Sequence, residues 1–155
     1  MKYLGVLISV KDIEVSKRFY KEVLGLKVES DLGANVTLTG GIALQTLDTW
    51  KGFIQKSEDN ILFGNNAGEL CFETRDIDSF CNLLSQRGDI CYVHLLYEHP
   101  WGQRAIRFYD PDRHIIEVGE DMGVVVKRFI SSGLSVAETA ARMGVPTVYV
   151  EQYIL

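Results

Sequence analysis

The chain has 155 residues, of which 46% are hydrophobic, and a formal net charge of −5 at pH 7. This length fits one domain or two small fused modules with a buried core, and the acidic balance argues against binding of nucleic acid, which needs clustered Lys and Arg. No apolar run approaches the roughly 18 residues of a membrane span, and no small-residue cleavage site follows the apolar N-terminus. The three cysteines lack metal-type spacing, so we expect reduced thiols in a cytoplasmic protein.

The first 49 residues predict a strand, a helix and three more strands. Residues 3–10 alternate with the period of a strand. Asp12 is a favourable helix N-cap, apolar residues follow it at helical spacing, and Gly25 is a stop signal. Three short strands separated by glycine-containing turns are expected at residues 27–31, 35–39 and 42–47.

Residues 50–67 carry Lys, Ser, Asp, Asn and Gly without firm periodicity, and we expect a linker or a flap there. The residues that follow repeat the order of the first module. Asp76 is the expected helix N-cap of this second module, and Asp-Pro-Asp at residues 110–112 predicts a tight turn. The strands of the second module are expected at residues 69–74, 91–97, 103–109 and 114–119.

The two modules share one pattern at a distance of 64 residues. Residues 5–28 and residues 69–92 each contain a short alternating apolar run, a basic residue, Asp-Ile, a helical pattern and a glycine, so that Asp12 corresponds to Asp76. A period of this length is too long for a solenoid. It predicts two modules that pair, with a site built where they meet.

Residues 121–155 lie outside the repeat and predict three helices, the second of which opens with a capping box of Ser135 and Glu138. This end of the chain resembles a helix-turn-helix, but the segment in the place of the recognition helix, residues 147–155, contains no Lys or Arg. We therefore expect the tail to cover the sheet or to strengthen a dimer, and not to bind DNA. The apolar residues of the tail that we expect to be buried are Val125, Phe129, Ile130, Leu134, Val148, Tyr153 and Ile154.

Two segments resemble the vicinal oxygen chelate superfamily, the glyoxalase/bleomycin resistance/extradiol dioxygenase group. Residues 9–30, SVKDIEVSKRFYKEVLGLKVES, are similar to its opening strand and helix, and residues 100–118, PWGQRAIRFYDPDRHIIEV, are similar to its closing hairpin. The resemblance covers roughly residues 3–120 and implies an α+β fold, in which two paired βαβββ modules form a curved mixed sheet around a cleft. It implies a domain of residues 1–120, made of modules 1–49 and 68–120, followed by a helical extension of residues 121–155.

The resemblance also implies where metal ligands would lie, because the family places them on the first and last strands of each module. The corresponding residues are Gly5, Gln45, Glu69 and Glu117. The last three are hard donors that suit zinc, nickel, manganese or magnesium. Gly5 leaves the set incomplete, so we expect weak metal binding that Gly5→His would tighten. The alternative is a lost metal site, in which the remaining side chains hydrogen-bond one another, water or Arg107.

Strand parity predicts which side chains face the cleft, because successive side chains point to opposite faces of a strand. Arg107 on this face would clamp a carboxylate or phosphate of a ligand, or else form a salt bridge to Glu73 or Glu117. His94 and His99 differ in parity, so in a regular strand both should not face the cleft. The residues expected to contact a ligand are Arg107, Tyr109, Trp101, Cys71 and Glu73.

We expect a homodimeric protein that binds or sequesters a small molecule, without nucleic acid or membrane as a partner. The alternative is a divalent-metal-dependent lyase or isomerase similar to glyoxalase I, the lactoylglutathione lyase, in which Glu69 and Glu117 would be catalytic. A DNA-binding regulator acting through the tail is the least favoured reading. The ligand itself does not follow from the fold.

Overall fold

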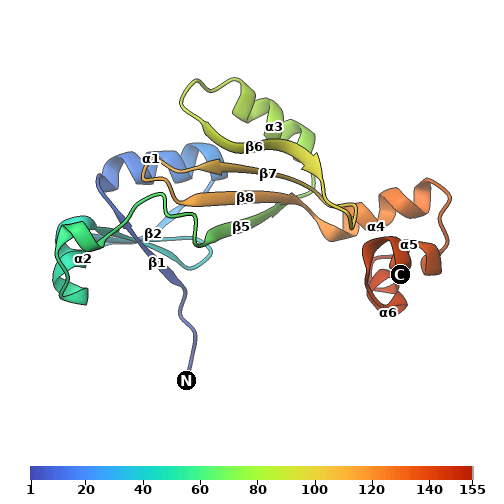
Figure 1. Ribbon diagram of the computed structural model, residues 1–155, viewed down its shortest axis with the longest axis horizontal. Coiled ribbons are helices and arrows are strands. Elements are labelled where there is room, and N and C mark those ends of the chain that lie inside the picture. The colour runs from blue at the N-terminus through green and yellow to red at the C-terminus, as the bar shows by residue number, and fades with distance from the viewer. Residues whose placement is uncertain (155) are drawn as a thin grey trace. The chain divides into compact units, whose positions relative to one another are not determined.

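The structure is a computed structural model in which residues 1–154 are described, and the chain divides into two compact units that we consider one at a time (Figure 1). The first unit comprises residues 1–68 and 109–114. Its elements are β1 (Val6–Val10), α1 (Ile13–Leu24), β2 (Val28–Asp31), β3 (Asn35–Leu38), β4 (Ile42–Thr46), α2 (Leu47–Ile54) and a short 3-10 helix, η1 (Glu58–Asn60).

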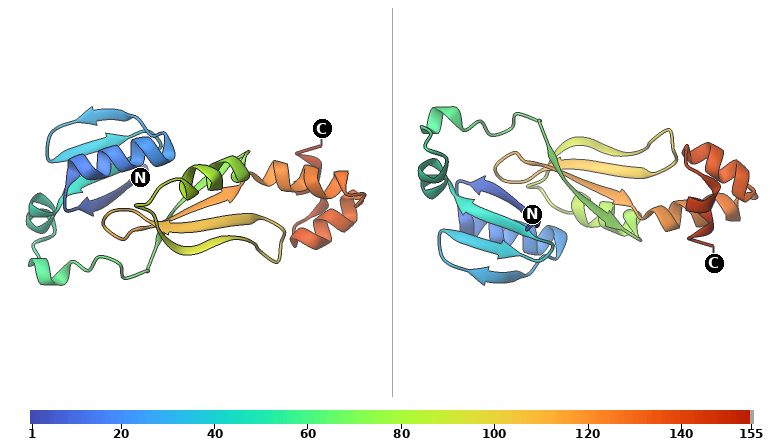
Figure 2. Two further views of the ribbon diagram at one scale, coloured as in Figure 1. Left: turned by 90° about the horizontal axis from the view of Figure 1, so that it is seen from above. Right: turned by 90° about the horizontal axis from the view of Figure 1, so that it is seen from below.

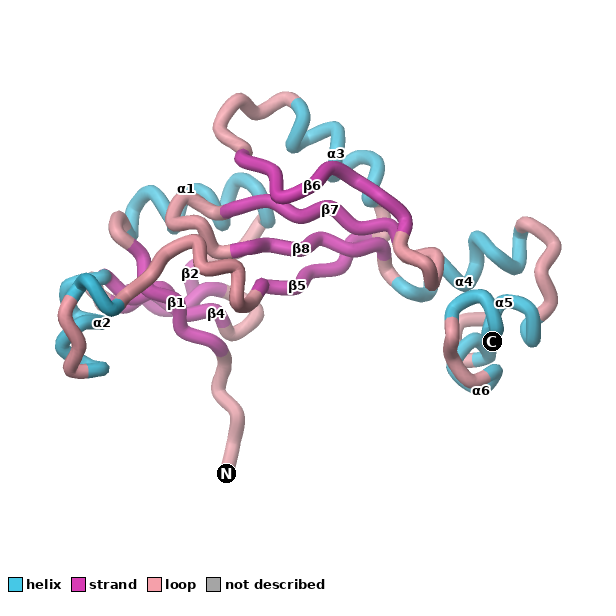
Figure 3. Tube along the Cα trace, viewed as in Figure 1, coloured by secondary structure: helices cyan, strands magenta, loops and turns pink. Residues whose placement is uncertain are grey.

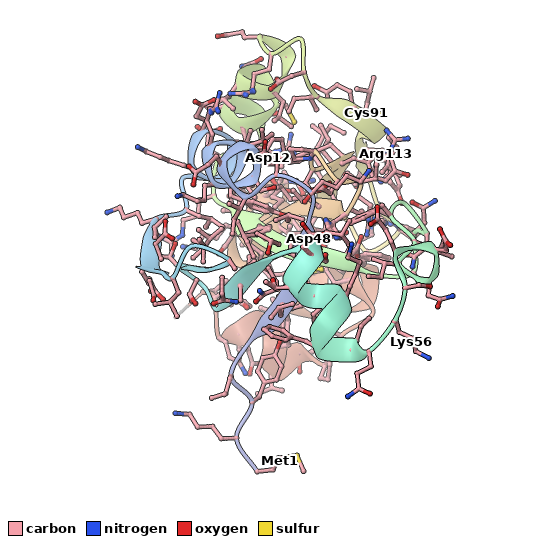
Figure 4. All side chains as sticks on the ribbon, turned by 90° about the vertical axis from the view of Figure 1, so that its left-hand side faces the viewer. Met1, Asp12, Asp48, Lys56, Cys91 and Arg113 are labelled. Atoms are coloured by element: carbon pink, nitrogen blue, oxygen red, sulfur yellow. The ribbon has the colours of Figure 1, made fainter. Side chains whose placement is uncertain are left out.

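The sheet of the first unit has the strand order β1-β4-β3-β2, with β1 parallel to β4 and β3 antiparallel to both of its neighbours. Helix α1 lies along one face of this sheet (Figure 2). Asp12, labelled in Figure 4, caps α1 by accepting hydrogen bonds from the backbone of Glu14 and Val15, as predicted. Phe19, Tyr20 and Val23 of α1 are buried.

Helix α2 was not predicted, since residues 50–67 were expected to form a linker or a flap. Its residues are partly or fully exposed, and its N-cap Thr46 makes no side-chain capping bond, so no cap marks where the helix begins. An ion pair of 2.9 Å between Asp48 and Lys51 supports it locally. Only residues 55–67 match the expected irregular segment, and even these contain η1.

The turn at residues 109–114 belongs to the first unit, although it connects two strands of the second sheet. The side chain of Asp110 accepts a hydrogen bond of 2.8 Å from the hydroxyl of the buried Tyr20. The side chain of Asp112 accepts one of 3.1 Å from the backbone of Lys11. Burial and the adjacent Asp110 carboxylate raise the pKa of Tyr20 well above its ordinary value, so this hydroxyl keeps its proton.

The second unit comprises residues 69–108 and 115–155 and contains the second sheet and the C-terminal helices (Figure 3). Its sheet has the order β5-β8-β7-β6, with β5 parallel to β8. Helix α3 packs on this sheet, where the ring centroids of Phe80 and Phe108 are 6.1 Å apart. The elements are β5 (Glu69–Thr74), α3 (Ile77–Ser85), β6 (Cys91–Glu98), β7 (Arg104–Tyr109), β8 (Ile115–Glu120), α4 (Met122–Ser131), α5 (Val136–Met143) and α6 (Thr147–Glu151).

The predicted duplication is confirmed by the topology. Each sheet pairs the first strand of its module with the last, in parallel, and continues through the third strand to the second. Each module also places one amphipathic helix directly after its first strand. The α+β class with two βαβββ modules and a C-terminal helical region is therefore correct.

The C-terminal helices form a small core of their own and do not cover the sheet, which corrects one expectation. Figures 1 and 3 show α4 leaving the end of β8, with α5 and α6 gathered beyond that end. The predicted capping box of Ser135 and Glu138 is present. Val148 is 58% exposed and Ile154 is 42% exposed, because α6 turns Val150 inward instead. The buried core residues are Val125, Val126, Phe129, Ala140, Met143 and Val150.

Over residues 1–154, the helices are all too short or too polar to cross a bilayer.

Candidate functional site

Three adjacent strands of the second sheet bring charged side chains together on one face. Glu69 and Cys71 alternate with partly buried residues along β5, and the register sets Glu117 of β8 opposite Cys71. Arg107 comes from β7, the next strand. One ligand atom from each of Glu69, Cys71 and Glu117 lies within 4.8 Å of the others. We call Glu69, Cys71, Glu117 and Arg107 the Arg107 cluster.

The guanidinium of Arg107 bridges both carboxylates of the cluster. Its Nε donates to Oε2 of Glu69 at 2.7 Å, and its Nη2 donates to Oε1 of Glu69 at 3.3 Å. The same Nη2 forms an ion pair with Oε2 of Glu117. These charge-assisted hydrogen bonds lower the pKa of Glu69 and raise that of Arg107. Of the two salt-bridge partners weighed for Arg107, Glu117 is therefore one, and Glu69 joins it.

Two histidines satisfy the remaining nitrogen of Arg107. Its Nη1 lies 3.2 Å from Nε2 of His94 and 3.4 Å from Nε2 of His99. Because arginine only donates, both Nε2 atoms act as acceptors, and the hydrogen-bond network assigns the proton of each ring to Nδ1. Nδ1 of His94 then donates to the carbonyl of Leu95 at 2.8 Å, and Nδ1 of His99 donates to the hydroxyl of Tyr97 at 2.8 Å. Burial, reinforced by Arg107, lowers the pKa of His99 below its ordinary value, consistent with a neutral ring.

His94 and His99 both reach Arg107, although in a regular strand their side chains would point to opposite faces. Strand β6 ends at Glu98, so His99 lies in the turn that follows, where strand alternation no longer applies. The backbone of His99 donates to the carbonyl of Gln103 at 2.8 Å, which closes the turn. Sequence periodicity alone carried no signal that would place His99 beside Arg107.

Aromatic rings extend from the cluster along this turn. The rings of His99 and Trp101 are stacked, with centroids 4.2 Å apart and an interplanar angle of 9°. The ring centroid of Tyr97 lies 4.5 Å from that of His99. Trp101 is 39% exposed and Tyr97 is 45% exposed, so both offer ring surface to solvent. Trp101 was a predicted ligand contact, and here it adjoins His99.

The roles of Tyr109, Glu73 and Cys71 as ligand contacts stay predictions, and the structure gives the surroundings of each side chain. Tyr109 belongs to the first unit, where its hydroxyl donates to Asn66 at 2.8 Å. Glu73 is exposed on the same face of β5 as Glu69. The thiol of Cys71 lies 3.8 Å from Oε1 of Glu69, and burial followed by the neighbouring carboxylates raises its pKa. Cys71 therefore stays a thiol and is a poor nucleophile.

Gln45 of the first unit is buried and hydrogen-bonded through both its amide oxygen and its amide nitrogen. Its Oε1 accepts from the side chain of Asn35 at 2.7 Å, and its Nε2 donates to the hydroxyl of Thr49. A ligand role would require Gln45 to share or break the bond to Asn35. That Gln45 shares a metal site with Glu69 and Glu117 stays a prediction.

The expected effect of Gly5→His is wrong on steric grounds. Gly5 precedes β1 with φ = 141°, and a Cβ built there would collide with the carbonyl oxygen of Gly41. The register also sets Gln45 opposite Ser9, four residues further along the strand, which is about 13 Å from Gly5 at the rise of a strand. A histidine at residue 5 would therefore distort the backbone without becoming a neighbour of Gln45.

The donor set of the cluster does not fit a resident divalent ion. Glu69 and Glu117 have suitable carboxylates, but the guanidinium of Arg107 already occupies the space between them and neutralises one of their two charges. The third donor, Cys71, carries a thiol whose raised pKa disfavours the thiolate that metals bind. An ion at this position would have to displace Arg107.

Comparison with known proteins places this chain in a family. The family model for the glyoxalase-like domain matches residues 3–123. An uncharacterised protein of Bacillus subtilis (strain 168) is 27% identical over 124 residues, which cover 76% of this chain and 97% of that protein. A crystal structure of a protein of unknown function from Agrobacterium tumefaciens str. C58 is 35% identical, with a TM-score of 0.71, and covers 78% of this chain and 94% of that one. A glyoxalase/bleomycin resistance protein/dioxygenase from Nocardioides shares the fold at 20% identity and a TM-score of 0.62, covering 77% and 83% of the two chains.

Proposed function

Because this chain belongs to the glyoxalase-like domain family of the vicinal oxygen chelate superfamily, we propose that it binds a small molecule at the Arg107 cluster without a resident metal ion. In this role it is a binding or sequestering protein. The observation that carries the proposal is the bridge from Arg107 to Glu69 and Glu117. In this chain the guanidinium of Arg107 lies between the two carboxylates, in the position that a metal ion would need.

The charge of the cluster supports a ligand that donates hydrogen bonds. Two carboxylates and one guanidinium leave a net charge of about −1 when His94 and His99 are neutral. All the donors of Arg107 that face the cluster already have partners, so a ligand carboxylate would find no free donor there. An ammonium or amidinium group would instead meet the free lone pairs of Glu69 and Glu117.

The aromatic side chains beside the cluster support a flat apolar part in the same ligand. Trp101 and Tyr97 expose ring surface next to His99, and His99 contacts Arg107. A planar cation would stack on a ring through its π-face while its charged group reaches the carboxylates. We therefore propose aromatic amines or amidines as the ligand class.

A metal-dependent lyase or isomerase is the second candidate. It is favoured by the close approach of Glu69, Cys71 and Glu117, whose ligand atoms lie within 4.8 Å of one another. In that case Arg107 would swing away, zinc, nickel, manganese or magnesium would bind, and a carboxylate would move a proton of the substrate. The two candidates differ in what Arg107 does, which makes this residue the point of test.

The test is zinc titration by calorimetry on untagged protein, with elemental analysis of the purified sample. We expect the wild type to contain far less than one equivalent of metal. Arg107→Met should bind zinc at least tenfold more tightly, or about 1.4 kcal/mol, because both carboxylates lose their cation. Arg75→Met, which removes an arginine that is 88% exposed in the same unit, should match the wild type. One equivalent of metal in the wild type, with no gain in Arg107→Met, would support the enzyme instead.

Ligand binding is tested separately by thermal shift with benzamidine and with benzoate, which differ in charge but share one ring. Benzamidine should stabilise the wild type, and benzoate should not. Trp101→Ala and Glu117→Gln should each remove the shift, while Arg75→Met should keep it. Equal shifts from both compounds would contradict the proposed charge preference.

We also propose that the protein is a homodimer, as the family commonly is. Strand β6 is an edge strand, and its Leu95 is 68% exposed, which makes it a candidate contact. Sedimentation of the wild type and of Leu95→Lys tests this proposal, since a monomer in the wild type would contradict it.

A further inference from the structure

The C-terminal helices hold the backbone of the turn between β6 and β7, residues 98–103, from two sides. Arg128 of α4 donates through Nη2 to the carbonyl of Gly102 at 2.6 Å. Arg142 of α5 donates through Nη1 to the carbonyl of Pro100 at 2.6 Å. Both arginines also reach Glu98, at 3.3 Å and 3.4 Å, where the turn begins. We call residues 98–103 the β6–β7 turn.

Packing reinforces these hydrogen bonds. A Cβ built on Gly102 would collide with the ring of Phe129, so α4 lies directly against this part of the turn. The φ angle of Gly102 is 90°, a conformation that residues with a side chain rarely adopt. The position thus requires glycine both for its backbone angle and for the approach of Phe129.

A buried carboxylate anchors Arg128 in this arrangement. Glu120 at the end of β8 is 1% exposed and accepts hydrogen bonds from Arg128 at 3.0 Å and from Arg104 at 2.9 Å. Burial alone would raise the pKa of Glu120, but the bonds from Arg104 and Arg128 outweigh it and lower that pKa. The β6–β7 turn is thereby tied to α4 and to the end of the sheet.

The same turn carries the rings that reach the Arg107 cluster. His99 contacts Arg107 and Trp101 stacks on His99, while the indole nitrogen of Trp101 donates to the side chain of Gln103 at 3.2 Å. A continuous set of contacts therefore runs from α4 and α5 through the turn to Arg107. Arg128 and Arg142 lie beyond residue 123, where the match to the family domain ends.

We propose that the C-terminal extension positions His99 and Trp101 against Arg107, and so sets the geometry of the candidate ligand site. Arg142 and Arg128 are the positioning residues. They act through the backbone of the β6–β7 turn and do not touch the cluster themselves. The consequence for ligand affinity rests on the proposed function, whereas the consequence for the two rings does not.

The experiment measures both rings in the absence of any ligand. Proton–carbon NMR of the three histidine rings reports the titration of His99, and tryptophan emission in a Trp50→Phe background reports Trp101. The charged or titratable groups that act on His99 are Arg107, Glu117, His94, Glu69 and Tyr97. In the parent protein we expect His99 to titrate below 6.5.

Arg142→Ala should raise the pKa of His99 toward its ordinary value and move Trp101 emission to longer wavelength, because the released turn exposes both rings. Arg142→Lys, which keeps one donor for the carbonyl of Pro100, should recover part of both effects. Lys127→Ala removes an exposed cation from α4 and is the matched control that should leave both readouts unchanged. Circular dichroism verifies that each variant is folded.

If Arg142→Ala folds and leaves both readouts equal to those of Lys127→Ala, the proposal is overturned. If it lowers only the melting temperature, the extension is merely stabilising and the proposal is also overturned. Should Arg142→Ala fail to fold, Arg142→Lys and Arg142→Gln provide the same comparison. A shifted His99 titration together with no benzamidine binding by the parent protein would support the positioning role and refute the proposed function, so the two failures are distinguishable.

Discussion

Arg107 donates to Glu69 through Nε at 2.7 Å, which fixes the edge of the guanidinium along β5 and leaves Nη1 directed at the histidines. The planar fork of an arginine suits this arrangement, because it presents donors in fixed directions to several acceptors. A lysine would offer one point charge and would not satisfy both carboxylates and both rings. The Arg107 cluster therefore depends on an arginine specifically.

Removal of Arg107 should destabilise the fold at neutral pH. Arg107→Met leaves the carboxylates of Glu69 and Glu117 close together without their cation, and we expect a loss of about 2 kcal/mol, between the values for exposed and buried ion pairs. Adding Glu117→Gln should recover most of this loss, because the repulsion disappears. Urea unfolding at pH 7 measures it, and an unchanged midpoint in Arg107→Met would show that the bridge contributes nothing.

Stability should fall in mild acid through His99. Its folded pKa is lowered by burial and by Arg107, so the unfolded chain binds a proton more readily. The stabilisation is fully present above the unfolded value of 6.5 and is lost as pH falls through the lower folded pKa. Urea midpoints between pH 7 and pH 5 should decline in the wild type and decline less in His99→Gln. Parallel declines in the two proteins would count against a neutral His99.

Protonation of Glu69 should cause a second decrease in the stability of the fold at lower pH. The bonds from Arg107 lower the folded pKa of Glu69, so its contribution is present above its ordinary value of 4.5 and is lost below it. Glu69→Gln should flatten the pH dependence of stability below 4.5 and retain the decline below 6.5 that His99 causes, although the loss of the Glu69 charge lowers the pKa of His99 further. If Glu69→Gln flattened only the decline below 6.5 and left the decline below 4.5 unchanged, the assignment of the two declines to His99 and Glu69 would be wrong.

Gly5→Ala should cost more than replacement of a glycine that has a positive φ but open space around its Cβ position. Gly33 has φ = 77° with open space around its Cβ position, so Gly33→Ala should cost only about 1 kcal/mol for the strained backbone. Gly5→Ala adds the collision with the carbonyl of Gly41 and should cost clearly more. Thermal unfolding of both variants checks this order. A Gly5→Ala variant as stable as Gly33→Ala would show that residue 5 can accommodate a side chain.

Within the C-terminal helices, burial should separate Met143 from Val148, which was expected from the sequence to be buried. Met143 is 5% exposed and Met143→Ala should cost about 2–5 kcal/mol, whereas Val148→Ala, at 58% exposure, should stay within about 0.5 kcal/mol. Urea unfolding monitored by circular dichroism measures the loss in the free energy of unfolding for both variants. A loss of stability in Val148→Ala as large as that in Met143→Ala would show that Val148 is buried in solution, against a surface outside the single chain.

Local signals made much of the fold predictable. At the N-caps Asp12, Asp76 and Ser135, the side chain accepts a hydrogen bond from a backbone N–H no more than three residues further along the chain. All three caps form as expected. Alternation along β5 likewise predicted that Glu69 and Cys71 share a face. Helix α2 escaped prediction because its N-cap Thr46 makes no side-chain capping bond, and its first residue, Leu47, falls within the range expected for the preceding strand.

The parts of the site that escaped prediction depend on geometry that a linear pattern does not encode. His99 follows the last residue of β6, so its direction is set by the β6–β7 turn and not by strand parity. The steric limit at Gly5 comes from Gly41, which is distant in sequence. The partners of Arg107 were weighed among three acids, and only the distances select Glu69 and Glu117.

The turn at residues 109–114 has a consequence for how a duplicated gene can evolve. Asp110 and Asp112, encoded in the second repeat, provide the acceptors for Tyr20 and for the backbone of Lys11 in the first. A fragment ending at residue 68 would retain the buried tyrosine but lose the carboxylate that accepts the hydrogen bond from its hydroxyl. The first repeat therefore depends on residues of the second repeat for these two acceptors, so a gene that encodes both repeats cannot be divided at residue 68 without the loss of both bonds.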